Sequence, residues 1–254
     1  MPKPVTLFAF IAMLAFTGTA MAQDDDLGAR MSMERIGDIR PGSYSAGDTY
    51  KFTLNHYLDR YLLRFANDPE IYVLYADHGS LGGRVLRYDS GTTALQVSGW
   101  GAITLYTDAE PSGIPAERTG DSTLPTVTQV SLAQVQAAAG DEAKHLAYAR
   151  RVRVTFTADW PALAGDPDLR AFAFDAMQNA ARGIERFAAR AAARAALAAR
   201  VDSVLMVTAG RPTIEMHGRT LNVAFNPEQG FAGRASSRGI ARGLGQMFSV
   251  PVVN

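Results

Sequence analysis

The hydrophobic pattern changes character halfway along the chain, and this change restricts the fold more than any other feature. Between residues 50 and 107 the apolar residues come in short runs rich in aromatic and β-branched side chains, which favour strands. Between residues 166 and 200 the chain is alanine-rich without interruption, which favours a helix. Because strands dominate the first half and helices the second, we predict an α+β fold.

An antiparallel β meander of about four to six strands is predicted for residues 50–107. Its clearest hairpin joins residues 84–88 to residues 92–97 through Asp89-Ser90-Gly91. A three-residue loop that ends in glycine suits a type I turn followed by a left-handed residue. Residues 108–125 contain three prolines and two glycines and are predicted to form a loop.

Helix signals dominate the second half, where long helices and a hairpin should pack against the meander. Ser131 and Gln134 have the spacing of a capping box, so a helix is expected to run to about residue 150, with a break at Gly140 as an alternative. Asp166 and Pro167 suit the start of the alanine-rich helix over residues 166–200. The other expected elements are strands over 152–156 and 204–208, a hairpin of 213–216 with 220–225, and a helix over 237–248.

The first 22 residues have the three-part layout of a secretory signal. Lys3 precedes an apolar run over residues 5–16, and small residues follow as far as Ala22. This run is shorter than the roughly 20 apolar residues that span a bilayer. We therefore predict cleavage between Ala22 and Gln23 and export to the periplasm or the cell exterior. Residues 23–48 are predicted to be a flexible leader and residues 49–254 a single α+β domain.

Composition excludes several kinds of site. The chain is 47% apolar and 20% charged, which suits a folded protein with a core. It contains no cysteine, which excludes disulfides, thiolate zinc sites and a lipid anchor on cysteine. The four histidines do not have the spacing of metal ligands, so neither a metal nor a cofactor is expected. No second apolar run is long enough for a transmembrane segment in the mature chain.

Basic residues are concentrated in the second half. Residues 23–130 contain 9 Lys/Arg against 15 Asp/Glu, whereas residues 131–254 contain 15 against 10. Four arginines spaced by four residues would form a stripe on one helix face: Arg182, Arg186, Arg190 and Arg194. One interpretation is a contact surface for anionic lipid, acidic polysaccharide or another envelope protein. The other is a solvated face, or one that packs against the acidic first half. Nucleic acid is not expected as a partner of a neutral, exported chain.

No motif in the sequence is specific for an enzyme. The chain lacks a GxSxG elbow, an SxxK pair and the glycine-rich phosphate loops. Asp77 and His78 precede a glycine-rich stretch and are loop candidates, but neighbouring residues in an extended chain point in opposite directions. A polar turn is the simpler interpretation. Trp100 lies between two glycines, which suits either an exposed stacking platform for sugars or a buried sheet corner.

Five segments of the chain together form a recognisable pattern: YLLRF at 61–65, PEIYVL at 69–74, RVLRYDSG at 84–91, GWGAITLYT at 99–107 and RTLNVAFNP at 219–227. They resemble a family of exported bacterial proteins described as domain of unknown function 4908. This resemblance implies no activity, ligand or catalytic residue.

From these observations we predict an exported envelope protein that is not an enzyme. It would bind an anionic partner through the helix that carries the four arginines. The alternative is a hydrolase of envelope glycans or peptides whose acid and base residues form no recognisable motif.

Overall fold

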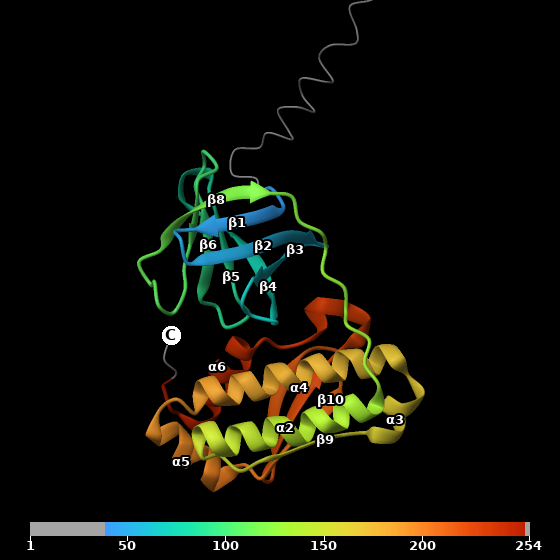
Figure 1. The fold of residues 1–254 in the computed structure, drawn as a ribbon. Helices are drawn as coiled ribbons and strands as arrows, with labels where there is room; N and C mark the ends of the chain where they lie inside the picture. The colour runs from blue at the N-terminus through green and yellow to red at the C-terminus, as the bar shows by residue number, and fades with distance from the viewer. Residues whose placement is uncertain (1–38, 252–254) are drawn as a thin grey trace, which may run out of the picture. The chain divides into compact units, whose positions relative to one another are not determined.

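The computed structural model describes residues 39–251, so the predicted signal and its cleavage site lie outside the described residues. Within this range the first half is a β-barrel, and the second half combines helices with a separate four-stranded sheet (Figure 1). This arrangement confirms the predicted α+β class.

The barrel consists of eight antiparallel strands, each paired with its neighbours in sequence, and the last strand pairs with the first. The strands are β1 (Gly42–Ala46), β2 (Tyr50–Tyr57), β3 (Arg60–Phe65), β4 (Ile71–His78), β5 (Arg84–Arg87), β6 (Thr93–Val97), β7 (Ile103–Leu105) and β8 (Ile114–Gly120). Buried side chains such as Phe52, Leu63 and Leu95 fill its interior. The interior of the barrel is therefore filled with side chains and forms a hydrophobic core.

The barrel extends the predicted meander at both ends. Strand β1 lies inside the predicted leader, and strand β8 lies inside the predicted loop. Neither has a strong apolar alternation, because no β8 residue is buried and four of the seven are exposed, and β1 contributes only Tyr44 and Ala46 to the core. Their pairing with each other closes the sheet, and pairing over such a sequence distance leaves no local signal.

The second half contains five α-helices and four strands, besides a 3-10 helix over Pro227–Gly233. They are α2 (Leu132–Arg150), β9 (Thr155–Ala158), α3 (Trp160–Gly165), α4 (Pro167–Phe187), α5 (Ala191–Arg200), β10 (Ser203–Thr208), β11 (Thr213–His217), β12 (Thr220–Phe225) and α6 (Ser237–Phe248). Strands β9, β10 and β12 are parallel, and β11 completes the predicted hairpin with β12. No helix within residues 39–251 is both long and apolar enough to cross a membrane.

Helix starts follow the predicted caps. Ser131 and Gln134 make both bonds of the capping box, and α2 continues unbroken through Gly140. The Asp166 carboxylate accepts hydrogen bonds at the start of α4, where Pro167 occupies the first turn. Local side-chain chemistry therefore determines where these two helices begin.

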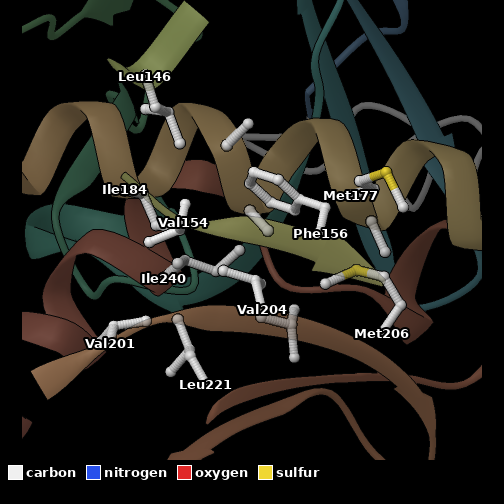
Figure 2. Packing of buried hydrophobic residues seen from close by; sticks show 14 of the residues in the cluster. Leu146, Val154, Phe156, Met177, Ile184, Val201, Val204, Met206, Leu221 and Ile240 are labelled. Carbon is white, nitrogen blue, oxygen red and sulfur yellow. The ribbon is translucent and has the colours of Figure 1, made fainter. Parts of the chain in front are cut away.

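Helices α2 and α4 pack side by side and cover the second sheet (Figure 1). Figure 2 shows Leu146 of α2 and Ile184 of α4 with their side chains directed toward those of Val154, Val204 and the other labelled core residues. At Gly183, a Cβ atom would lie 2.6 Å from Cγ2 of Ile240 in α6. Helices α4 and α6 therefore approach each other closely.

The predicted single helix over residues 166–200 is interrupted. Helix α4 ends at Phe187 and α5 begins at Ala191, with Arg190 in an extended conformation between them. Arg194 donates hydrogen bonds to the carbonyl oxygens of Ala188 and Ala189, at 3.1 and 3.0 Å. These bonds satisfy carbonyls that the break leaves without helical partners. No glycine or proline marks this break. Helix propensity therefore predicted one continuous helix, and this prediction was wrong.

The barrel has two chemically different ends. Successive antiparallel strands place their connections alternately at one end and then the other. The connections β3–β4, β5–β6 and β7–β8 contribute Glu70, Asp89 and Asp108 to one end, which we call the charged end. The opposite end includes the β2–β3 connection, Leu58-Asp59, and the β4–β5 and β6–β7 connections. The last two, residues 79–83 and 98–102, contain no charged residue. We call these two connections the uncharged loops.

Candidate anion-binding site

The charged end of the barrel contacts the start of α6. Glu70 Oε1 accepts a hydrogen bond from the backbone N–H of Ser237 at 2.7 Å, and Asp89 Oδ2 accepts one from the N–H of Ser236 at 2.7 Å. The N-terminus of a helix has free N–H groups and a partial positive charge, which carboxylates stabilise. These two carboxylates therefore fix the position of α6 against the barrel.

Glu70 belongs to the internal structure and is not an accessible acid. It is 1% exposed, and Nε of Arg182 lies 3.7 Å from its Oε2 atom. Burial raises the pKa of Glu70, against the hydrogen bonds from Ser237 and the charge of Arg182. A carboxyl this deeply enclosed cannot reach a solute, so its role is to hold α4 and α6.

Asp108 joins two arginines that come from different helices. Its carboxylate accepts hydrogen bonds from Nη1 of Arg186 in α4 at 2.8 Å and from Nη1 of Arg238 in α6 at 2.7 Å. Burial alone would raise the pKa of Asp108, but the two guanidinium groups outweigh it and hold the pKa below its usual range. The Arg238 guanidinium also lies over the Tyr88 ring, 4.4 Å from its centroid. Asp108 therefore fixes both guanidinium groups in place.

A cavity of about 510 Å³ opens beside these arginines. Its lining includes Arg186, Arg238 and Arg242, and we call it the arginine groove. No acidic side chain occurs among the described residues that line it. A second cavity of about 500 Å³ shares Thr92 and Arg238 with it and includes Asp108. Three guanidinium groups with one neighbouring carboxylate leave a net positive charge, which favours anions.

Arg242 is the arginine of this groove that has no internal partner. Within residues 39–251 it forms neither a hydrogen bond nor an ion pair, and its side chain is exposed. Its guanidinium lies against Gly91, where a Cβ atom would be 2.5 Å from Nη1. Its donors remain available to a ligand, whereas those of Arg186 and Arg238 are partly used by Asp108.

The structure separates the four arginines of the predicted stripe. Arg182 and Arg186 belong to α4 and contact Glu70 and Asp108 of the barrel. Arg190 lies at the helix break and donates to the carbonyl of Pro251 at 3.4 Å, and Arg194 caps the end of α4. The expectation of one continuous stripe was wrong because the helix ends before Arg190. Of the four, the arginine groove contains Arg186.

The loop candidates lie away from the arginine groove. Asp77 and His78 end strand β4, and Asp77 Oδ2 accepts a hydrogen bond from Nε of Arg87 at 2.9 Å. Both side chains are exposed, and the His78 side chain has no hydrogen-bond partner within residues 39–251. Trp100 is 79% exposed in the β6–β7 loop, which is the exposed alternative of its two interpretations. Within the described chain, no group of three acidic or histidine side chains could hold a metal ion.

Sequence reasoning missed Arg238, Arg242 and Asp108. The two arginines have the four-residue spacing that identified the series on α4, so the same criterion applied to residues 237–248 would have found them. Asp108 gives no such signal, because its role depends on two arginines that follow it by more than seventy residues.

A family model described as domain of unknown function (DUF4908) matches residues 26–244, which confirms the family resemblance of the sequence. No curated protein and no solved structure matches the chain.

Proposed function

The chain belongs to the family described as domain of unknown function 4908, and we propose that it is an exported envelope protein that binds acidic polysaccharide in the arginine groove. The observation that carries this proposal is the position of Arg186, Arg238 and Arg242 along one cavity without an acidic lining residue. Guanidinium groups form paired hydrogen bonds with carboxylate and sulfate groups.

The shape of the site favours a chain-like ligand over a single ion. The two adjoining cavities share Thr92 and Arg238, so an extended ligand could occupy both. Hydroxyl and amide groups accompany the guanidinium groups, among them Ser90 and Gln246, and such groups suit sugar hydroxyls. Asp108 disfavours an anion at one position in the second cavity, which would restrict how the charges of a ligand can be spaced.

Binding to alginate, a carboxylate polysaccharide, tests this proposal, with uncharged dextran as the ligand control. Calorimetry should detect alginate and not dextran, and the affinity should fall with added salt because exposed charges are screened. Arg242→Gln should weaken binding about tenfold, the effect expected for the loss of hydrogen bonds to a charged group.

Arg153→Gln is the matched protein control, because Arg153 is also exposed and lies outside the groove. Equal losses in the Arg242 and Arg153 variants would show non-specific charge attraction and reject the groove. Unchanged alginate binding in Arg242→Gln would also reject it. Because Arg242 has no internal partner, its replacement should leave the urea unfolding midpoint unchanged.

Export is the second part of the proposal and rests on the residues before Gln23. The positive start, the short apolar run and the small residues at Ala20 and Ala22 support a cleaved signal. Mass spectrometry of the protein recovered from the periplasm and the medium should give a chain that begins at Gln23. Recovery of only the uncleaved chain from the cytoplasm would contradict export.

A further inference from the structure

The uncharged loops each expose one large apolar side chain. The β4–β5 loop, Gly79-Ser80-Leu81-Gly82-Gly83, presents Leu81 with 88% of its surface exposed. The β6–β7 loop, Ser98-Gly99-Trp100-Gly101-Ala102, presents Trp100 with 79% exposed. Single exposed apolar residues are ordinary on protein surfaces. Here, however, two of them lie at the tips of neighbouring loops that carry no charge.

The two loops lie directly beside each other. Strands β5 and β6 pair so that Arg84 is opposite Val97. The β4–β5 loop ends just before Arg84 and the β6–β7 loop begins just after Val97, so the two loops meet at this pair. A Cβ atom at Gly83 would lie 2.4 Å from the carbonyl oxygen of Val97. Leu81 and Trp100 therefore belong to one end of one sheet.

Both loops are held in shape by internal hydrogen bonds. Gly79 N–H donates to the Gly83 carbonyl at 2.8 Å, and Ala102 N–H donates to Oγ of Ser98 at 3.0 Å. Leu81 has a φ of 53°, a left-handed conformation that places a leucine where glycine is usual. These bonds fix the shape of the two loops, so presenting Leu81 and Trp100 at the tips costs little further conformational entropy on binding.

We infer that Leu81 and Trp100 insert into the surface of a lipid bilayer. The loops contain no charge to desolvate, and tryptophan favours the boundary between head groups and acyl chains. The nearest charged residues, Arg84 and the Asp77–Arg87 ion pair, lie on the strands behind the tips. Arg84 could extend toward lipid phosphates while the tips remain in the apolar layer.

A second copy of the chain is a poorer occupant of this end. An aromatic side chain buries about 150–250 Å², and a stable protein interface needs about 800 Å² from each partner. Two side chains fall well short of that area. A bilayer needs no complementary surface, so a small apolar tip is sufficient for weak binding.

Flotation with vesicles of phosphatidylcholine tests the inference. These vesicles have no net charge, so binding does not depend on the arginine groove, and Arg242→Gln should float like the unmodified protein. The double variant Leu81→Ser with Trp100→Ser should reduce the bound fraction at least tenfold. Tyr148→Ser is the matched control, because Tyr148 is 83% exposed on α2, and it should bind normally.

Tryptophan fluorescence locates the contact. In a Trp160→Phe background, Trp100 is the remaining tryptophan, and its emission should shift to shorter wavelength when vesicles are added. Absence of flotation by the unmodified protein, or equal flotation of the double variant, would overturn the inference. A fluorescence shift that follows protein concentration without vesicles, together with dimers in light scattering, would show self-association and also overturn it.

Discussion

Hairpin connections form both ends of the barrel, but the side chains of these connections lie in different environments. At the charged end, Glu70 and Asp89 accept hydrogen bonds from the start of α6, and Asp108 binds two arginines. At the other end, Leu81 and Trp100 extend from the uncharged loops into solvent. The barrel therefore has one end that is used within the molecule and, at the other end, two loops whose tips are free.

This difference separates residues needed for folding from residues available for binding. A buried carboxylate such as Glu70 is stable only while its donors remain in place, so its removal leaves uncompensated groups. Replacing an exposed leucine or tryptophan costs little stability, because the side chain buries little surface in the folded chain. Substitutions at the charged end should therefore reduce stability, and those in the uncharged loops should not.

The largest effect is expected for Glu70→Ala. This change leaves the N–H of Ser237 without an acceptor and Arg182 without its carboxylate. Breaking a buried charged pair costs about 3 kcal/mol, and urea unfolding should show a loss of that size. Asp59→Ala is the control, because the Asp59 side chain is 82% exposed beside Arg60 and should matter by less than about 0.5 kcal/mol. Equal effects would show that the charged end does not hold the two halves together.

A smaller loss is expected for Gly183→Ala. Gly183 lies on α4 beside Arg182, and its added methyl group would meet Ile240 and the carbonyl oxygen of Ser237. Overpacking of this kind costs about 2 kcal/mol, and it would also separate α4 from α6, which bind the carboxylates of the charged end. Gly140→Ala on α2 is the control, because that position has open space and alanine should add about 0.5 to 1 kcal/mol. A neutral Gly183→Ala would mean that α6 can shift without loss.

The pH dependence of stability should also identify the charged end. Because burial raises the pKa of Glu70 above its ordinary value of 4.5, the folded chain holds this proton more tightly than the unfolded chain. The stability that protonated Glu70 contributes is fully present below pH 4.5, and it is lost as the pH rises through the pKa of Glu70 in the folded chain. Glu70→Gln removes this dependence, so the stability of the variant relative to the unmodified protein should increase as the pH rises above 4.5. A constant difference in urea unfolding would contradict the raised pKa.

The sequence identified features whose causes are local. The hairpin through Asp89-Ser90-Gly91 forms as predicted, with Gly91 at a φ of +80°, and the capping box at Ser131 starts α2. Closure of the barrel by β1 and β8 was missed, because pairing between residues 42–46 and 114–120 depends on the whole sheet. Local patterns therefore predicted the class and most elements but not the topology.

The candidate site shows the same limit. Charge spacing drew attention to Arg186, but it could not show that Arg186 would meet Asp108 or that the helix would end before Arg190. Arg242 is recognisable as the free cation only after the structure shows which carboxylates the other arginines use. The electrostatic role of a charged residue depends on partners that lie far away in the sequence. The sequence therefore identified candidate residues, and the structure showed which of them contact each other.

The smallest effect is expected for Leu81→Gly in the uncharged loops. Glycine relieves the left-handed conformation of Leu81, a gain of about 1 kcal/mol, but it also increases the freedom of the unfolded chain, a loss of about 0.5 to 1 kcal/mol. The free energy of unfolding should therefore change by less than about 0.5 kcal/mol, measured by urea unfolding. Gly91→Ala at the charged end is the comparison, because its φ of +80° disfavours any side chain and the change should lose about 1 kcal/mol. A loss of that size for Leu81→Gly would mean that this leucine stabilises the fold, and the distinction between a used end and free loop tips would fail.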